Sequence, residues 1–181
     1  MLGLMLSLWL FLMLELFFLA ESGKVDGAFN VTKQQSTIDK FAFGKVPILQ
    51  VQASFYYHNE SDLNFETVDD IPVRTSIALI LDYEYGERYE KSRHRFNEVR
   101  VSSQKQIIKL LQLKRVDMAI MFDDVAEYYL SELKLNRDEI KKGHINHTSD
   151  IFVAFNKNKK LSEVISLLDQ GLYKTHVRYH D

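Results

Sequence analysis

A chain of 181 residues is long enough for one domain or two small ones. Its hydrophobic content of 46% and its charged content of 27% are typical of a folded protein and exclude a disordered one. The formal net charge of −2 gives no indication of nucleic-acid binding, and the absence of cysteine excludes disulfides and thiolate metal sites.

The first predicted element is an apolar segment, Leu2 to Ala20, in which Glu15 is the single charged residue. Three interpretations remain open: a secretory signal, a membrane anchor of about 20 apolar residues, or a helix of the folded protein. The basic start of a signal is missing, Phe18-Leu19-Ala20 is a poor cleavage signature, and Glu15 would be costly inside a bilayer. We favour a signal or an anchor, and therefore a periplasmic or extracytoplasmic protein, in the second case tethered through residues 2–20.

The first half of the chain predicts strands separated by polar segments. Strands are predicted from runs rich in Val, Ile, Phe and Tyr, and helices from apolar residues spaced three and four apart. In chain order, the predicted elements are a turn and strand at 23–31, a polar helix start at Thr32, a strand at 48–57, a polar loop at 59–70, a strand at 76–81, a charged helix from Tyr85 to about residue 95 and a strand at 98–101.

The most informative stretch runs from Lys105 to Leu130. Apolar residues at helical spacing predict a helix up to residue 113, and the apolar run at 118–122 has the length of a buried strand. Asp123 and Asp124 follow, where the N-terminus of the next helix favours negative charge. This order of helix, turn, strand and helix is a crossover unit of an α/β fold.

The remainder predicts a polar connection at 133–148, a strand at 151–155 and an amphipathic helix at 161–172. Alternating strands and helices indicate an α/β fold with largely parallel sheets. The strands at 48–57 and 151–155 bracket a self-contained middle part. This arrangement is expected when one lobe is inserted in another through two connecting strands, as suits a protein that closes around a ligand.

Several segments resemble, in this order, the extracytoplasmic solute-binding proteins of ABC importers, specifically family 3, whose members often bind amino acids. Residues 23–29 (GKVDGAF) look like the family's G-x-x-D strand, and Leu110 to Asp117 look like its L-x-x-G-R-V-D segment. Residues 41–47, 83–86 and 151–157 are similar to the passage into the first hinge strand, the strand-to-helix turn of the second lobe and the returning strand.

The resemblance covers roughly residues 21–180 and implies a periplasmic-binding-protein-like α/β fold with two lobes joined by two hinge strands. Lobe 1 would comprise residues 21–58 and 151–181, lobe 2 would comprise residues 59–150, and residues 1–20 would be a separate apolar segment. The family has a βαβα portion before its G-x-x-D strand, and only the apolar segment stands there. The chain is therefore expected to be N-terminally truncated, with an incomplete first lobe.

The resemblance also implies where a ligand would bind. Family members hold a ligand carboxylate with an arginine three residues after a threonine, and these positions are Gln35 and Thr32 here. They hold the ligand ammonium with an aspartate at the position of Phe122, whereas Asp123 comes one residue later and would face the other side of the strand. Since the guanidinium fork that matches a carboxylate is missing, an ordinary L-amino acid is a doubtful ligand.

The strand-to-helix turn differs from the family pattern as well. The family's glycine and small hydroxyl residue correspond to Asp82 and Glu84, two acids that would repel an incoming carboxylate. Tyr83, Tyr85 and Phe122 are interpreted either as an aromatic wall that with these acids receives a cation, or as core packing. The candidate ligand-binding residues are Thr32, Gln35, Asp82, Tyr83, Glu84, Tyr85, Phe122 and Asp123.

No glycine-rich phosphate loop, nucleophile elbow or H-E-x-x-H motif occurs, so we expect no catalytic residue, no enzyme activity and no cofactor. His144 and His147 are interpreted as part of a solvated loop, and no metal site is expected. The first hypothesis is a monomeric, non-enzymatic extracytoplasmic protein that closes around a small polar solute for ABC-type transport, with a membrane permease as its partner. The alternative is a degenerate or repurposed domain that acts as a sensor or interaction module or has no ligand.

Overall fold

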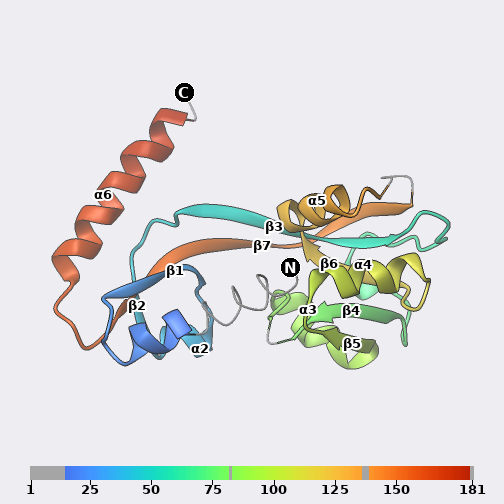
Figure 1. Ribbon diagram of the computed structural model, residues 1–181, viewed down its shortest axis with the longest axis horizontal. Helices are drawn as coiled ribbons and strands as arrows, with labels where there is room; N and C mark the ends of the chain where they lie inside the picture. Colours follow the sequence, from blue (N-terminus) through green and yellow to red (C-terminus); the bar gives the residue numbers. More distant parts are fainter. Residues whose placement is uncertain (1–14, 82, 136–138, 180–181) are drawn as a thin grey trace. The chain divides into compact units, whose positions relative to one another are not determined.

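The structure, a computed structural model, describes residues 15–81, 83–135 and 139–179. The chain forms two compact units, which we call the outer unit (Met1–Gln50 with Asp150–Asp181) and the inserted unit (Val51–Ser149). Two strands join them, β3 (Leu49–His58) and β7 (Ile140–Asn156) (Figure 1).

The sheet of the inserted unit has the strand order β7-β3-β6-β4-β5. Strand β4 (Ser76–Ile80) lies between β5 (Asn97–Val101) and β6 (Met118–Phe122) and is parallel to both, whereas β3 is antiparallel to β6. The expected α/β architecture is confirmed, but the described parts of the chain show parallel pairing between β4 and β5 and between β4 and β6, and antiparallel pairing between β3 and β6. Parallel neighbours need a crossover connection, and β4, β5 and β6 are accordingly linked by helices. Strand β3, in contrast, comes from the outer unit.

Three helices connect these strands: α3 (Glu87–Ser92), α4 (Gln104–Gln112) and α5 (Asp123–Glu132). Helix α4 begins where the Ser103 hydroxyl accepts a hydrogen bond from the Gln106 N–H, which satisfies one free donor of its first turn. Helices α4 and α5 pack against each other and against β6.

The core of the inserted unit follows the alternation of its strands. Met118 and Ile120 of β6 lie in one cluster with Phe55 and with Tyr89, whose ring is stacked on that of Phe96 at 5.7 Å between centroids. Ala119 and Met121, the alternate residues of the same strand, are also buried and face the side of α4 and α5. Both faces of β6 are therefore covered.

The predicted polar connection at 133–148 is wrong from residue 140 onward, because β7 begins at Ile140 and continues for 17 residues. Its first half is almost entirely polar, and Lys141 and Lys142 are exposed. A strand that is held by backbone hydrogen bonds to β3 does not need apolar side chains, so the hydrophobic pattern gave no signal here.

In the outer unit, β1 (Gly27–Thr32) and β2 (Phe41–Phe43) both pair with β7 in antiparallel orientation. They lie on opposite sides of β7, because Phe155 is the partner of Gly27 on one side and of Ala42 on the other. The short helix α2 (Gln35–Ile38) connects β1 and β2, and α6 (Ser162–Tyr179) follows β7. The carboxylate of Asp169 in α6 accepts hydrogen bonds from the N–H groups of Lys45 and Val46, at 2.9–3.0 Å.

Part of the predicted apolar segment belongs to the outer unit. Residues 15–21 are helical, Ala20 is fully buried, and the ring of Phe17 lies 6.0 Å from that of Phe41. Asn156, at the end of β7, donates hydrogen bonds from Nδ2 to the carbonyl oxygens of Ala20 at 2.6 Å and Glu21 at 3.0 Å. The rest of the segment, residues 1–14, lies outside the described residues.

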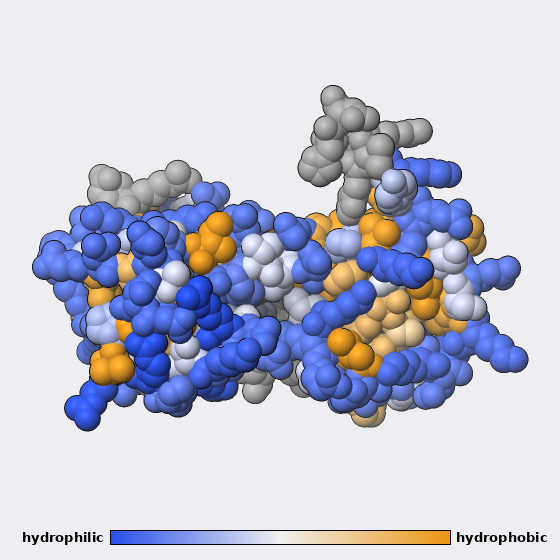
Figure 2. All heavy atoms as spheres, turned by 180° about the vertical axis from the view of Figure 1, so that it is seen from behind, coloured by the Kyte–Doolittle hydropathy of each residue, from blue (hydrophilic) through white to orange (hydrophobic). Residues whose placement is uncertain are grey.

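None of the described helices combines the length and the hydropathy that a bilayer crossing requires. The outer unit exposes several large apolar side chains, and orange areas mark apolar groups on the right of Figure 2. Phe18, Phe29, Val164 and Leu167 are each at least 50% exposed.

Candidate functional site

Two aromatic residues meet where β4 and β6 end. Tyr83 follows β4 and Phe122 is the last residue of β6, and their ring centroids are 6.3 Å apart. Because parallel strands end at the same edge of a sheet, this edge is where α/β proteins usually bind ligands. The Tyr83 side chain is 40% exposed, and its partial burial raises the pKa of its hydroxyl.

A third ring, that of His147, joins this pair from β7. Its centroid lies 5.9 Å from that of Phe122 and 6.5 Å from that of Tyr85, in edge-to-face orientations. His147 is half-buried, so its interpretation as part of a solvated loop is wrong. The sequence pattern does not predict this contact, because it indicates a strand only at 151–155, whereas β7 already begins at Ile140. We call Tyr83, Phe122 and His147 the aromatic cluster.

Asn146 connects the backbone at Tyr85 to the ring of His147. Its Nδ2 lies 2.7 Å from the carbonyl oxygen of Tyr85 and 2.8 Å from Nδ1 of His147. Gly86, next to Tyr85, has a φ of +82°, and a Cβ atom there would lie 2.8 Å from Cβ of His147. The His147 side chain is therefore held between the backbone at residue 86 and the ring of Phe122.

The structure places Tyr85 in the core of the inserted unit, where it is only 3% exposed. Its hydroxyl accepts a hydrogen bond from the N–H of Ile80 at 2.7 Å, and burial raises the pKa of this hydroxyl far above its usual value. The Tyr85 N–H donates to the carboxylate of Glu90 at 2.9 Å. The side chain of Tyr85 thus supports the aromatic cluster from within the core.

Asp123 lies away from the aromatic cluster. Its carboxylate accepts hydrogen bonds from the Tyr56 hydroxyl at 2.9 Å and from Nζ of Lys142 at 2.7 Å. Tyr56 alternates along β3 with Phe55 and Tyr57, which face the core cluster, so it points to the opposite face. Burial, together with the hydrogen bond to Asp123, raises the pKa of Tyr56 strongly. The charge of Asp123 is compensated within the inserted unit.

The remaining candidates fall in different places. Thr32 ends β1 in the outer unit, and its carbonyl accepts a hydrogen bond from the Thr37 hydroxyl at 2.7 Å. Gln35 begins α2, is exposed, and donates from Nε2 to the carboxylate of Asp39 at 2.8 Å. Glu84 is exposed in the inserted unit, next to Tyr83. Asp82 lies outside the described residues.

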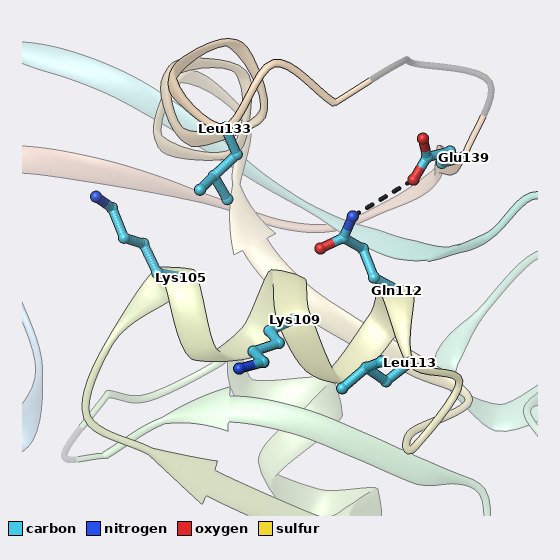
Figure 3. A pocket seen from close by; sticks show the side chains of 6 residues that line it. All are labelled: Lys105, Lys109, Gln112, Leu113, Leu133 and Glu139. Atoms are coloured by element: carbon cyan, nitrogen blue, oxygen red, sulfur yellow. Dashed lines mark hydrogen bonds between the residues drawn. The ribbon is translucent and has the colours of Figure 1, made fainter.

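A groove of about 490 Å³ lies elsewhere on the inserted unit, between α4 and the segment that follows α5 (Figure 3). It is lined by Lys105, Lys109, Gln112, Leu113, Leu133 and Glu139. The Lys105 ammonium pairs with Glu132 at 2.7 Å, and Gln112 donates to Glu139 at 3.4 Å. None of the described candidate ligand-binding residues lines this groove, and three of its polar side chains, Lys105, Gln112 and Glu139, already have partners in the chain.

The fold is shared with several solved structures of amino-acid-binding proteins. Holo ArgBP from T. maritima superposes with a TM-score of 0.66 and 14% identity, over 87% of this chain and 67% of that protein. AbpA from Streptococcus pneumoniae, an amino acid ABC transporter substrate-binding protein bound to L-arginine, gives 0.67 and 17%, over 90% of this chain and 67% of AbpA. The GluR0 ligand-binding core from Nostoc punctiforme in complex with L-glutamate gives 0.65 and 16%, over 90% and 72% of the two chains.

These similarities confirm the fold that the sequence motifs suggested, a periplasmic-binding-protein-like α/β fold with two lobes joined by two hinge strands. No protein-family model matches the sequence, and the comparison with curated proteins finds no match. Similarity at 14–17% identity shows the shared fold and does not identify a solute. The solute must therefore be inferred from the residues of this chain.

Proposed function

We propose that this chain, which has the fold of two-lobed amino-acid-binding proteins, is a non-enzymatic binding protein for a small polar solute. In this proposal the inserted unit and the outer unit act as the two lobes, and β3 and β7 act as the hinge for their closure. The observation that carries it is the aromatic cluster at the ends of β4 and β6, the edge at which this class of sheet binds ligands.

A role in ABC-type transport is part of the proposal. It is supported by the fold shared with AbpA, an ABC transporter substrate-binding protein, and with holo ArgBP. The protein would then act outside the cytoplasm as a monomer and present its solute to a membrane permease. The apolar sequence of residues 2–20 would serve as its signal or its membrane tether.

The proposed solute is not an ordinary L-amino acid. Gln35, which the family resemblance of the sequence puts at the position of a carboxylate-binding arginine, has no charge, and its amide donates to Asp39. Asp123 is neutralised by Lys142 and lies on a different face of the sheet from the aromatic cluster. The loss of one bidentate charge-assisted contact weakens binding by roughly ten- to a hundredfold, from about 1.5–3 kcal/mol.

A thermal-shift screen of the full chain tests this function. The panel contains L-arginine, L-glutamate and neutral polar solutes, and we expect a rise in Tm with at least one neutral solute and none with the two amino acids. A ligand at a hundred times its Kd stabilises the folded protein by about 2.7 kcal/mol, which such a screen detects.

Substitution of the aromatic cluster provides the control. Tyr83→Ala is expected to abolish the rise in Tm, and Tyr173→Ala, which removes a ring that is 65% exposed in α6, is expected to leave it unchanged. Stabilisation by L-arginine or L-glutamate would contradict the argument about the solute.

The second candidate function is a repurposed domain that acts as a sensor or interaction module, or binds no solute. It is favoured by the internal partners of Asp123 and Gln35, two positions at or next to those used by the related proteins. A screen that shows no stabilisation with any solute would favour this candidate over the first.

A further inference from the structure

We infer that His147 is a specificity-determining residue of the proposed solute site, where its Nε2–H group donates a hydrogen bond to an acceptor on an uncharged planar group packed against Tyr83 and Phe122. The inference rests on the proposed function and adds to it the chemical class of the solute. It follows from the hydrogen bonds that fix the ring, from its surroundings and from the charges beside it.

The first step is the position of the imidazole proton. The carbonyl oxygen of Tyr85 can only accept, so the Asn146 atom 2.7 Å from it must be the donating Nδ2. The same amide nitrogen lies 2.8 Å from Nδ1 of His147, and because an amide nitrogen can only donate, Nδ1 must accept. An imidazole nitrogen that accepts a hydrogen bond carries no proton. The proton of the neutral ring is therefore on Nε2.

The second step is the charge of the ring. Burial lowers the pKa of His147, while Glu90 acts in the opposite direction and more weakly. The carboxylate of Glu90 already has partners, the Tyr85 N–H at 2.9 Å and the Arg93 guanidinium at 3.0 Å. The other rings in contact with His147, those of Tyr85 and Phe122, bring no charge. The imidazole is therefore neutral at pH 7 and has one N–H donor.

The third step is the availability of that donor. Within the described parts of the chain, Nε2 has no hydrogen-bond partner, and the half-buried side chain belongs to a cluster whose Tyr83 is 40% exposed. The backbone of Gly86, which leaves no room for a Cβ, restricts the side chain on one side. A donor held in place before binding loses little conformational entropy when the solute arrives.

The fourth step is the class of solute. An ammonium group offers only donors and would face the Nε2–H group with another donor. The guanidinium of Arg100 donates from Nη1 to the Tyr83 carbonyl at 3.4 Å and is paired with Glu98 at 3.0 Å, so it brings another set of donors and no uncompensated charge. Glu84, an exposed acid that follows Tyr83 in the sequence, disfavours an anion. An uncharged ring that carries a carbonyl oxygen or a ring nitrogen matches all these groups.

Nuclear magnetic resonance of the ¹⁵N-labelled full chain tests the first two steps without any solute. Long-range ¹H–¹⁵N spectra at pH 7 are expected to show His147 neutral and protonated on Nε2, with the signals assigned by their loss in His147→Gln. A ring protonated on Nδ1, or on both nitrogens, would overturn the inference whether or not the protein binds a solute.

Titration with two small probes tests the class of solute. Benzamide has a ring and a carbonyl acceptor, whereas benzylamine has a similar ring and a cationic donor. We expect benzamide to shift the His147 Nε2 signal and the backbone amides of Tyr83 and Phe122, and benzylamine to leave them unchanged. Equal responses to the two probes, or no response to benzamide at His147, would overturn the inference.

Two variants separate a hydrogen bond from simple packing. His147→Phe keeps a ring and removes the donor, and it should weaken benzamide binding roughly three- to tenfold, the value of one neutral hydrogen bond. His147→Gln keeps an N–H group near the position of Nε2 and should recover part of this loss, while His94→Gln, at an exposed histidine, should have no effect. Unchanged affinity in His147→Phe would refute the role of His147, and a solute found in the thermal-shift screen would still support the proposed function.

Discussion

At the scale of single residues, Gly86 decides how the aromatic cluster is built. Its φ of +82° lies in a region that residues with a side chain rarely adopt, and a Cβ atom at this position would lie 2.8 Å from Cβ and 2.9 Å from Cγ of His147. Glycine removes both obstacles, because it has no side chain to clash and no preference against positive φ. The cluster therefore depends on a residue that has no side chain of its own.

Gly86→Ala is expected to lower the free energy of unfolding by about 1–3 kcal/mol and to displace the signals of the His147 ring. Urea denaturation and the NMR spectra described above measure the two effects. Gly171→Ala is the matched control: this glycine lies in α6 with nothing near its missing Cβ, so alanine should stabilise the helix by about 0.5–1 kcal/mol. Equal effects of the two substitutions would contradict the assigned role of Gly86.

The lowered pKa of His147 also predicts how stability depends on pH. Below the ordinary histidine pKa of about 6.5 the unfolded chain takes up a proton that the folded chain resists, so stability falls as the pH drops through this value toward the folded pKa. The urea midpoint should decrease between pH 7.5 and pH 5.5, and the decrease should be smaller in His147→Gln. A variant as acid-sensitive as the parent chain would show that His147 does not contribute.

At the scale of secondary structure, the sequence is informative where local pattern and fold agree. The predicted strand at 118–122 and the helix beginning at Asp123 are β6 and α5, because an apolar run followed by two acids signals a buried strand and then a helix N-terminus. The first half of β7 was missed, because its polar residues show no apolar alternation and pairing with β3 uses only the backbone.

The side chain of Asn156 makes hydrogen bonds between elements far apart in the chain, which no local sequence pattern predicts. It is 2% exposed and donates to two carbonyl groups at the end of the helix at 15–21, while its Oδ1 accepts from the Asn158 N–H at 2.8 Å. Asn156→Ala should destabilise the outer unit by about 1–3 kcal/mol, because the hydrogen bonds of the buried Asn156 amide are lost and the Ala20 carbonyl keeps only the Gly23 N–H as a donor. Hydrogen exchange of the Lys24 amide, which bonds to Leu19, should accelerate.

The exposed Asn158 gives a comparison for this substitution. Asn158→Ala keeps the backbone N–H that bonds to Asn156 and should change stability by less than about 0.5 kcal/mol. A loss as large as that of Asn156→Ala would mean that the buried amide is not what holds the helix.

The candidate site was predictable only in part for the same reason. The sequence places Tyr83 and Phe122 at the ends of two predicted strands, as an aromatic wall or as core packing, and alternation along the strand at 118–122 indicates that Asp123 faces away from Phe122. The adjacency of the two strands comes from the structure. The contact of His147 with Phe122 joins residues that are 25 positions apart in the chain and depends on the extended β7. A tertiary contact of this kind cannot be predicted from a single sequence.

At the scale of the whole molecule, each unit has a core of its own. Phe55, Tyr89 and Ile120 belong to a cluster of the inserted unit, whereas Val31 and Phe41 belong to a separate cluster of the outer unit. Units with separate cores can open independently, because the loss of contacts in one leaves those in the other intact.

Phe41→Ala, at a residue that is 3% exposed, tests this independence. Hydrogen–deuterium exchange is expected to show a loss of protection equivalent to about 3–5 kcal/mol in β1 and β2, and little change in β4 and β5. A uniform loss over both units would mean that the chain opens as one cooperative body.

One detail of the outer unit bears on how such a chain can be altered. The Ile48 N–H donates to the Ile151 carbonyl at 2.7 Å, and the Gln50 side chain donates to Asp150 at 2.9 Å. Strands β3 and β7, which join the two units, therefore leave the outer unit side by side. The ninety-nine residues between them form a cassette whose two ends are neighbours. A tight turn could replace this cassette, or a foreign domain with adjacent termini could be grafted in its place, and the same geometry makes it a natural segment for exchange by recombination.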